Sequence, residues 1–194
     1  MKPGARAREY ENALNWLVDA DIVSKVNRIS RPGLPLSAYD DLSAFKIYAI
    51  DVGILRRLSH LPTTAFAENN RLFTEFKGAL TENYVHQSLV RQFEVPPRYW
   101  AEAPHEVDFI IQRETDVIPI EAKAGENVKA TSVKRYTKNY ASDTPIVVRL
   151  SLRNLSYDGI ILNVPLFMID KLDMLIGMAA STGTNETRLT AEDF

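Results

Sequence analysis

Apolar residues recur at helical spacing in several stretches of the chain. Between residues 7 and 20 they lie three and four positions apart, which predicts an amphipathic helix with one buried face. Asp51 precedes a second such stretch and is placed as its N-terminal cap. Further helices are expected over 52–59, 71–93, 131–140 and 165–180, the third of them polar.

Other stretches alternate apolar and polar residues or are continuously apolar, which favours strands. Breaks at 31–35 and at Pro96-Pro97 separate them from their neighbours. From residue 71 onward the order is helix, three strands, helix, strand, which is typical of a mixed α/β fold. The expected strands are 22–29, 45–50, 98–101, 107–111, 117–122, 145–150 and 159–163.

Composition adds several exclusions. Hydrophobic residues make up 45% of the 194 and charged residues 25%, the values of an ordinary globular protein. The net charge is −2, so nucleic-acid binding would need a local basic surface. Cysteine is absent, which excludes disulfides and thiolate metal sites. The sequence shows no signal peptide and no membrane-spanning stretch, and we expect a cytoplasmic protein.

The common nucleotide and hydrolase motifs are missing. The sequence has no G-x-x-x-x-G-K-[ST] loop, so no ATP site is expected in this chain. It has no G-x-S-x-G motif either. His60, His86 and His105 lack the spacing of zinc ligands, and we interpret His86 as a solvated side chain on the long helix.

A group of carboxylates interrupts two apolar runs. Asp108 lies within one predicted strand, and Glu121 with Lys123 lies thirteen residues further on, in the next. Glu121 and Lys123 point to the same side because side chains alternate along a strand. If residues 112–116 form a hairpin turn, Asp108 and Glu121 become neighbours. Glu82 of the preceding helix is a candidate third carboxylate.

This arrangement fits metal-dependent phosphodiester chemistry. Mg²⁺ prefers oxygen ligands and keeps several waters, so one to three carboxylates suffice to hold it. A neighbouring lysine can orient a water or neutralise charge that develops on a phosphoryl group. Spacing alone leaves a second interpretation open, in which Asp108 faces water on an edge strand and Glu121 with Lys123 forms an exposed ion pair.

Several ordered segments resemble a known family. That family is domain of unknown function 4143, the C-terminal domain of many bacterial and archaeal AAA+-type ATPases. The resemblance covers residues 10 to 167, roughly, and is carried by the segments 45–55 (FKIYAIDVGIL), 78–85 (GALTENYV), 99–100 (YW), 106–109 (EVDF), 120–125 (IEAKAG) and 163–166 (NVPL).

The resemblance implies a PD-(D/E)xK restriction-endonuclease-like core, an α/β fold with a mixed central sheet flanked by helices. It implies Asp108 and Glu121 as ligands of Mg²⁺ or Mn²⁺, Glu82 as an additional acidic ligand, and Lys123 as the catalytic lysine. Family members carry an ATPase domain that is missing from this chain and is therefore an expected partner.

The resemblance also suggests a domain division. Residues 1–65 are expected to form a partial winged-helix-like segment with a connector, because the helix from Ala7 and the strand from Ile22 resemble its last helix and wing. Residues 66–180 would form the nuclease-like domain, and 181–194 a polar tail.

Basic residues gather directly after Lys123. Between Lys123 and Lys138 there are five basic residues and one acidic residue, with tyrosines interleaved. This pattern fits contact with a phosphate backbone, and it equally fits a solvated helix face. The candidate contacts with DNA or RNA are Lys129, Lys134, Arg135 and Lys138. Tyr99 and Trp100 are expected in the core rather than stacked on bases.

Two functional hypotheses follow. The first is a magnesium-dependent nuclease that hydrolyses phosphodiester bonds of DNA or RNA as the C-terminal part of an ATPase-family protein. The second is a catalytically inactive nuclease-like module, attached to or derived from such an ATPase, that binds nucleic acid or protein.

Overall fold

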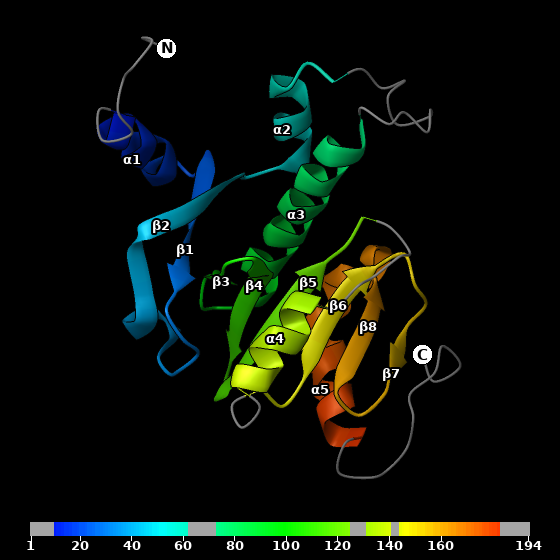
Figure 1. Ribbon diagram of the computed structural model, residues 1–194. Coiled ribbons are helices and arrows are strands. Elements are labelled where there is room, and N and C mark those ends of the chain that lie inside the picture. Colours follow the sequence, from blue (N-terminus) through cyan, green and yellow to red (C-terminus); the bar gives the residue numbers. More distant parts are fainter. Residues whose placement is uncertain (1–9, 62–72, 125–130, 141–143, 183–194) are drawn as a thin grey trace.

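The apolar runs of the sequence form the strands of a single mixed sheet. A computed structural model describes residues 10–61, 73–124, 131–140 and 144–182. The strand order is β2-β1-β3-β4-β5-β6-β8-β7 (Figure 1). The strands are β1 (Val23–Ile29), β2 (Asp40–Ala49), β3 (Arg98–Glu102), β4 (His105–Arg113), β5 (Asp116–Ala122), β6 (Val147–Ser151), β7 (Ser156–Tyr157) and β8 (Ile161–Pro165).

Strand directions follow from the lengths of the connections. β3, β4 and β5 are joined by short turns and pair antiparallel, whereas β6 pairs parallel to β5 after a helical crossover. β8 continues the parallel part beside β6, and the two-residue β7, which the sequence did not predict, pairs antiparallel to β8. The expected hairpin is confirmed, with Arg113 opposite Asp116 at its turn. The mixed α/β class is likewise confirmed.

Helices cover both faces of this sheet. On one face Leu89 of α3 and Leu175 of α5 share a core with Phe109 of β4. On the other face, seen in front in Figure 1, Tyr136 of α4 packs with Trp100 of β3. Tyr99 and Trp100 are both buried, as expected. The helices are α1 (Glu11–Asp19), α2 (Val52–Leu58), α3 (Phe73–Gln92), α4 (Thr131–Asn139) and α5 (Leu172–Thr182), with short 3₁₀ segments η2 (Leu36–Tyr39) and η5 (Leu166–Lys171).

The N-terminal hairpin belongs to the same sheet. β1 pairs antiparallel to β2 and parallel to β3, through Arg28 with Tyr99 and Ile29 with Trp100. An ion pair of 2.6 Å between Arg98 and Asp40 also joins β3 to β2. The described residues before 62 form α1, this hairpin with η2 in its connection, and α2, and the winged-helix interpretation of that segment stays a prediction.

A side chain of α3 ties this helix to the end of β2. The buried amide of Asn83 accepts a hydrogen bond from the backbone N–H of Ala49 (2.8 Å) and donates one to its carbonyl oxygen (3.0 Å). Gln87, one turn further along α3, accepts a bond from the N–H of Val52 (3.0 Å). These contacts fix where β2 ends and α2 begins.

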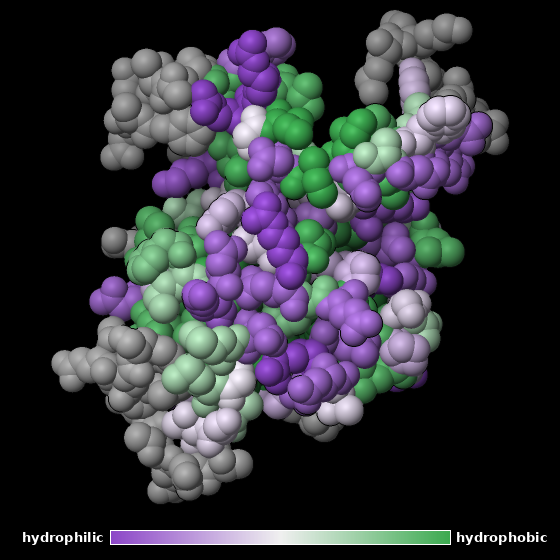
Figure 2. Space-filling view, turned by 180° about the vertical axis from the view of Figure 1, so that it is seen from behind, coloured by the Kyte–Doolittle hydropathy of each residue, from purple (hydrophilic) through white to green (hydrophobic). Residues whose placement is uncertain are grey.

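The expectation that the first helix buries one face is wrong. None of the nine described residues of α1 is buried, and Trp16 is 77% exposed. Helical spacing reports which residues share a face, and it carries no information on whether another element lies against that face. On the opposite side from α4 the middle of the surface is mainly hydrophilic, and apolar side chains reach the surface in the upper part and toward both edges (Figure 2).

No described helix is long and apolar enough to cross a membrane.

Candidate functional site

The register between β3 and β4 shifts by one residue at Asp108. β4 has two residues, Asp108 and Phe109, where β3 has only Tyr99. Because of this bulge, Val107 and Ile110 both lie in the core on the α4 face, while Phe109 lies in the core on the α3 face. A bulge redirects a side chain and interrupts the regular ladder, and bulges are frequent next to active sites.

Asp108 and Glu121 meet across two strands. The register that pairs Phe109 with Ile120 puts Asp108 opposite Glu121 when it is extended by one residue. The carboxylate of Asp108 accepts a hydrogen bond of 2.8 Å from the N–H of Ala122. Asp108 is only 8% exposed and Glu121 2%. The interpretation of these residues as exposed surface charges is therefore wrong.

Lys123 lies between the two carboxylates. Its Nζ is 3.1 Å from Oε1 of Glu121 and 4.0 Å from Oδ2 of Asp108. Burial alone would lower the pKa of Lys123, but the nearby carboxylates outweigh it and the pKa is raised. A fixed positive charge therefore sits beside both acids.

The electrostatics of Asp108 are dominated by its burial. Burial raises the pKa of Asp108 to about 6, although Lys123 acts in the opposite direction. The charge of Glu82 raises it further. The carboxylate thus changes charge close to neutral pH, and a bound cation would favour its ionised form.

Glu82 reaches the site from α3 and has its own partners. Nζ of Lys46 lies 3.6 Å from its Oε2, and the hydroxyl of Tyr48 donates to the same oxygen at 3.1 Å. Both partners belong to β2, far away in sequence. Sequence reasoning missed Lys46 and Tyr48. Their spacing of two residues, which places them on one side of a strand, was the available signal.

A divalent cation fits the chemistry of Asp108 and Glu121. Oε2 of Glu121 is buried and accepts no hydrogen bond, so it retains a free lone pair next to a second carboxylate. Unsatisfied buried carboxylate oxygens are costly, and Mg²⁺ or Mn²⁺ accepts such ligands together with waters. Within the described ranges, no group of three His, Cys, Asp or Glu side chains is arranged to hold a metal. Metal binding by Glu82 accordingly stays a prediction.

Residues 77–168 match the family model described as Domain of unknown function (DUF4143). This DUF4143 region contains Glu82, Asp108, Glu121 and Lys123. Residues 1–65, which include Lys46 and Tyr48, match a second model, described as Domain of unknown function (DUF8612). No curated protein and no solved structure matches the chain. The site thus combines side chains from both matched regions.

A buried histidine of the DUF4143 region, His86, packs against Tyr48 of the other matched region. The ring of His86 stacks on the ring of Tyr48, with 4.8 Å between centroids, and His86 is 1% exposed. Burial lowers its pKa to about 4, so the ring is neutral at physiological pH. The expectation of a solvated histidine is wrong, because β2 covers this side of α3.

The basic helix of the DUF4143 region lies on the opposite face of the sheet from α3. Lys134 and Lys138 of α4 are exposed, while Arg135 donates a hydrogen bond to Glu102 at 3.0 Å. Lys129 falls outside the described residues. Tyr136 is buried and meets Trp100 edge to face, with ring centroids 5.4 Å apart, so it serves the core. Nucleic-acid contact by Lys134, Arg135 and Lys138 stays a prediction.

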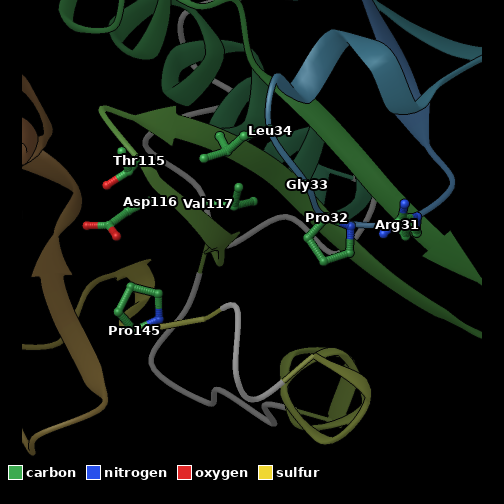
Figure 3. A pocket seen from close by; sticks show the side chains of 8 residues that line it. All are labelled: Arg31, Pro32, Gly33, Leu34, Thr115, Asp116, Val117 and Pro145. Carbon is green, nitrogen blue, oxygen red and sulfur yellow. The ribbon is translucent and has the colours of Figure 1, made fainter.

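A cavity of about 410 Å³ lies away from the carboxylates of Asp108 and Glu121. It is formed by the loop 31–34, the turn residues Thr115 to Val117 and Pro145 (Figure 3). Thr115 and Asp116 stand at the turn of the β4–β5 hairpin, whereas Asp108 and Glu121 lie toward the other ends of the two strands. This cavity is therefore separate from the candidate site.

Proposed function

We propose that this chain is a divalent-metal-dependent nuclease domain that hydrolyses phosphodiester bonds in DNA or RNA. The observation that carries the proposal is the contact of Asp108, Glu121 and Lys123 on adjacent strands, with one buried carboxylate oxygen left free. The order α3, β3–β5, α4, β6 supports a PD-(D/E)xK-like core.

Each residue has a distinct role in this proposal. Asp108 and Glu121 hold Mg²⁺ or Mn²⁺, which supplies an activated water and stabilises charge on the phosphoryl group. The Nζ of Lys123, beside both carboxylates, positions the attacking water and neutralises negative charge that develops during the reaction. Glu82 tunes the site through its charge, which acts on Asp108.

Exposed basic residues would guide the substrate. Lys134 and Lys138 on α4 supply a positive surface for the phosphate backbone. The resemblance to AAA+-associated proteins adds an ATPase domain as the proposed partner. In that arrangement the nuclease-like domain acts on nucleic acid while the partner hydrolyses ATP.

The test is cleavage by the purified chain of supercoiled plasmid, single-stranded DNA and RNA, in Mg²⁺ and then Mn²⁺. Asp108→Asn is expected to remove cleavage and keep the fold, because it loses one charge and no volume. Asp116→Asn is the matched control, since it changes an aspartate on the same hairpin at its far end, and it should cut like wild type. Equal cleavage by wild type and Asp108→Asn would contradict the proposal.

A second function has its own supporting observation. Lys123 already pairs with Glu121, and Lys46 pairs with Glu82, so protein cations offset these acids. A non-catalytic nuclease-like module that binds nucleic acid or protein would need no more than this. It predicts no cleavage with either metal, and binding that survives Glu121→Gln.

A further inference from the structure

Lys46 brings a positive charge to the site from outside the DUF4143 region. It lies on β2, the edge strand of the sheet, and its Nζ is 3.6 Å from Oε2 of Glu82. The same ammonium group forms an ion pair with Glu106 at the start of β4. One lysine is therefore shared by two carboxylates that flank Asp108, one from the helix and one from the strand.

The position of Lys46 is well defined by its surroundings. Its side chain is 21% exposed, and Nζ also lies 5.1 Å from the centroid of the Tyr99 ring. Tyr99 is the residue opposite the bulge that contains Asp108. Burial alone would lower the pKa of Lys46, but Glu82, Glu106 and Asp108 together raise it. The group thus stays charged over the physiological pH range.

We propose that Lys46 acts as the built-in counter-ion of this site, so that the site takes one divalent ion, at Asp108 and Glu121, instead of two. This inference rests on the proposed metal-dependent function and specifies its metal content. It also gives the N-terminal hairpin a role in the site, since β2 supplies the lysine.

Charge and ligand supply both argue for a single ion. A second divalent ion about 4 Å from the first would need further carboxylates. Glu82 and Glu106 are the neighbouring candidates, and both are engaged by Lys46. Lys123 pairs with Oε1 of Glu121 and leaves Oε2 of that residue free for the first ion. Oε2 of Glu82, in contrast, is already occupied by Lys46 and by the hydroxyl of Tyr48.

The experiment is a titration of the full chain with Mn²⁺ that measures the number of ions bound per chain. Calorimetry detects the binding, and electron paramagnetic resonance measures the concentration of free Mn²⁺. Wild type should bind one ion. Lys46→Met should bind two, because Glu82 and Glu106 lose their counter-ion. Lys46→Arg keeps the charge and should bind one. Lys25→Met is the matched control, since Lys25 lies on the neighbouring strand with its Nζ over the Phe45 ring, and it should also bind one.

A double variant protects the test against misfolding. Lys46→Met combined with Glu82→Gln removes both members of the pair, leaves no unpaired charge at Glu82, and should return the stoichiometry to one. Circular dichroism and a melting curve establish that each variant is folded.

The outcomes separate the two proposals. Two ions in wild type, or one ion in folded Lys46→Met, would overturn the role of Lys46 and leave the metal site itself intact. No ion in wild type would overturn the proposed metal-dependent function, and the role of Lys46 with it.

Discussion

The N–H of Ala122 donates a hydrogen bond of 2.8 Å to the carboxylate of Asp108. Beyond the end of the β4–β5 ladder, a side chain therefore joins the two strands that carry the candidate metal ligands. The contact orients Asp108, yet the carboxylate remains buried and burial disfavours its charge. The site holds its acid in place at a cost in stability whenever that acid is ionised.

This cost gives a stability prediction for Asp108→Asn. The pKa of Asp108 rises from 3.8 to about 6 on folding, so the unfolded chain loses its proton first as the pH increases. Wild type should lose stability relative to Asp108→Asn between pH 4 and 7, by roughly 2 to 3 kcal/mol, since each pKa unit corresponds to about 1.4 kcal/mol. Urea unfolding of both proteins in metal-free buffer at several pH values measures it. A difference that stays constant with pH would contradict the prediction.

Tyr48→Phe isolates the hydroxyl that supports Glu82. The ring of Tyr48 would keep its stacking on His86, while the hydrogen bond to Oε2 of Glu82 is lost. We expect a loss of about 1.5 to 3 kcal/mol in the free energy of unfolding, the range for a hydrogen bond to a charged group. Denaturant unfolding at pH 7 measures this. An unchanged free energy of unfolding would show that the hydroxyl does not stabilise Glu82.

Asp51→Ala should weaken the start of α2. Oδ1 of Asp51 accepts hydrogen bonds from the N–H groups of Gly53 (2.7 Å) and Ile54 (3.2 Å), as an N-terminal cap does. Loss of the cap is expected to cost about 0.5 to 2 kcal/mol, whereas Asp51→Asn should retain most of the stability. Thermal unfolding of the three proteins compares them. Equal losses in both variants would indicate that the negative charge, and not the capping geometry, matters at this position.

Neutralising α4 tests the proposed nucleic-acid surface. Lys134→Gln with Lys138→Gln removes two exposed charges and should lower the slope of log affinity against log salt by about 1.8 for duplex DNA. Arg135→Gln should have a smaller effect, because Glu102 already pairs with Arg135. Fluorescence anisotropy over about 50 to 200 mM NaCl measures the slope. A slope that is unchanged in the double variant would place DNA binding elsewhere.

Local features of the sequence predicted the elements well. The cap at Asp51, the turn between Gln112 and Asp116 and the break at Pro96-Pro97 each depend on residues within one turn of each other, and the structure has all three. The pairing of Asp108 with Glu121 followed from that turn, because a hairpin fixes its own register.

Long-range features escaped prediction. The burial of His86 and the partners of Glu82 depend on where β2 lies, and nothing near Lys46 or Tyr48 in the sequence specifies that position. The bulge at Asp108 depends on how Tyr99 of β3 aligns with β4. The exposure of Trp16 depends on whether another segment packs against its face of α1, and none of the described segments buries it. Each of these features depends on how segments that are far apart in the sequence pack against one another.

Asn83 has a consequence for any attempt to separate the two matched regions. Its buried side-chain amide forms hydrogen bonds with both the N–H and the carbonyl oxygen of Ala49, which lies in the other matched region. A fragment that began after residue 65 would lose both hydrogen-bond partners of Asn83, uncover the face of α3 that β2 covers, and leave the edge of β3 open to pairing with other chains. Such a fragment should aggregate, and the intact chain should unfold in one cooperative transition. We therefore expect that the boundary between the two matched regions is not a boundary in folding.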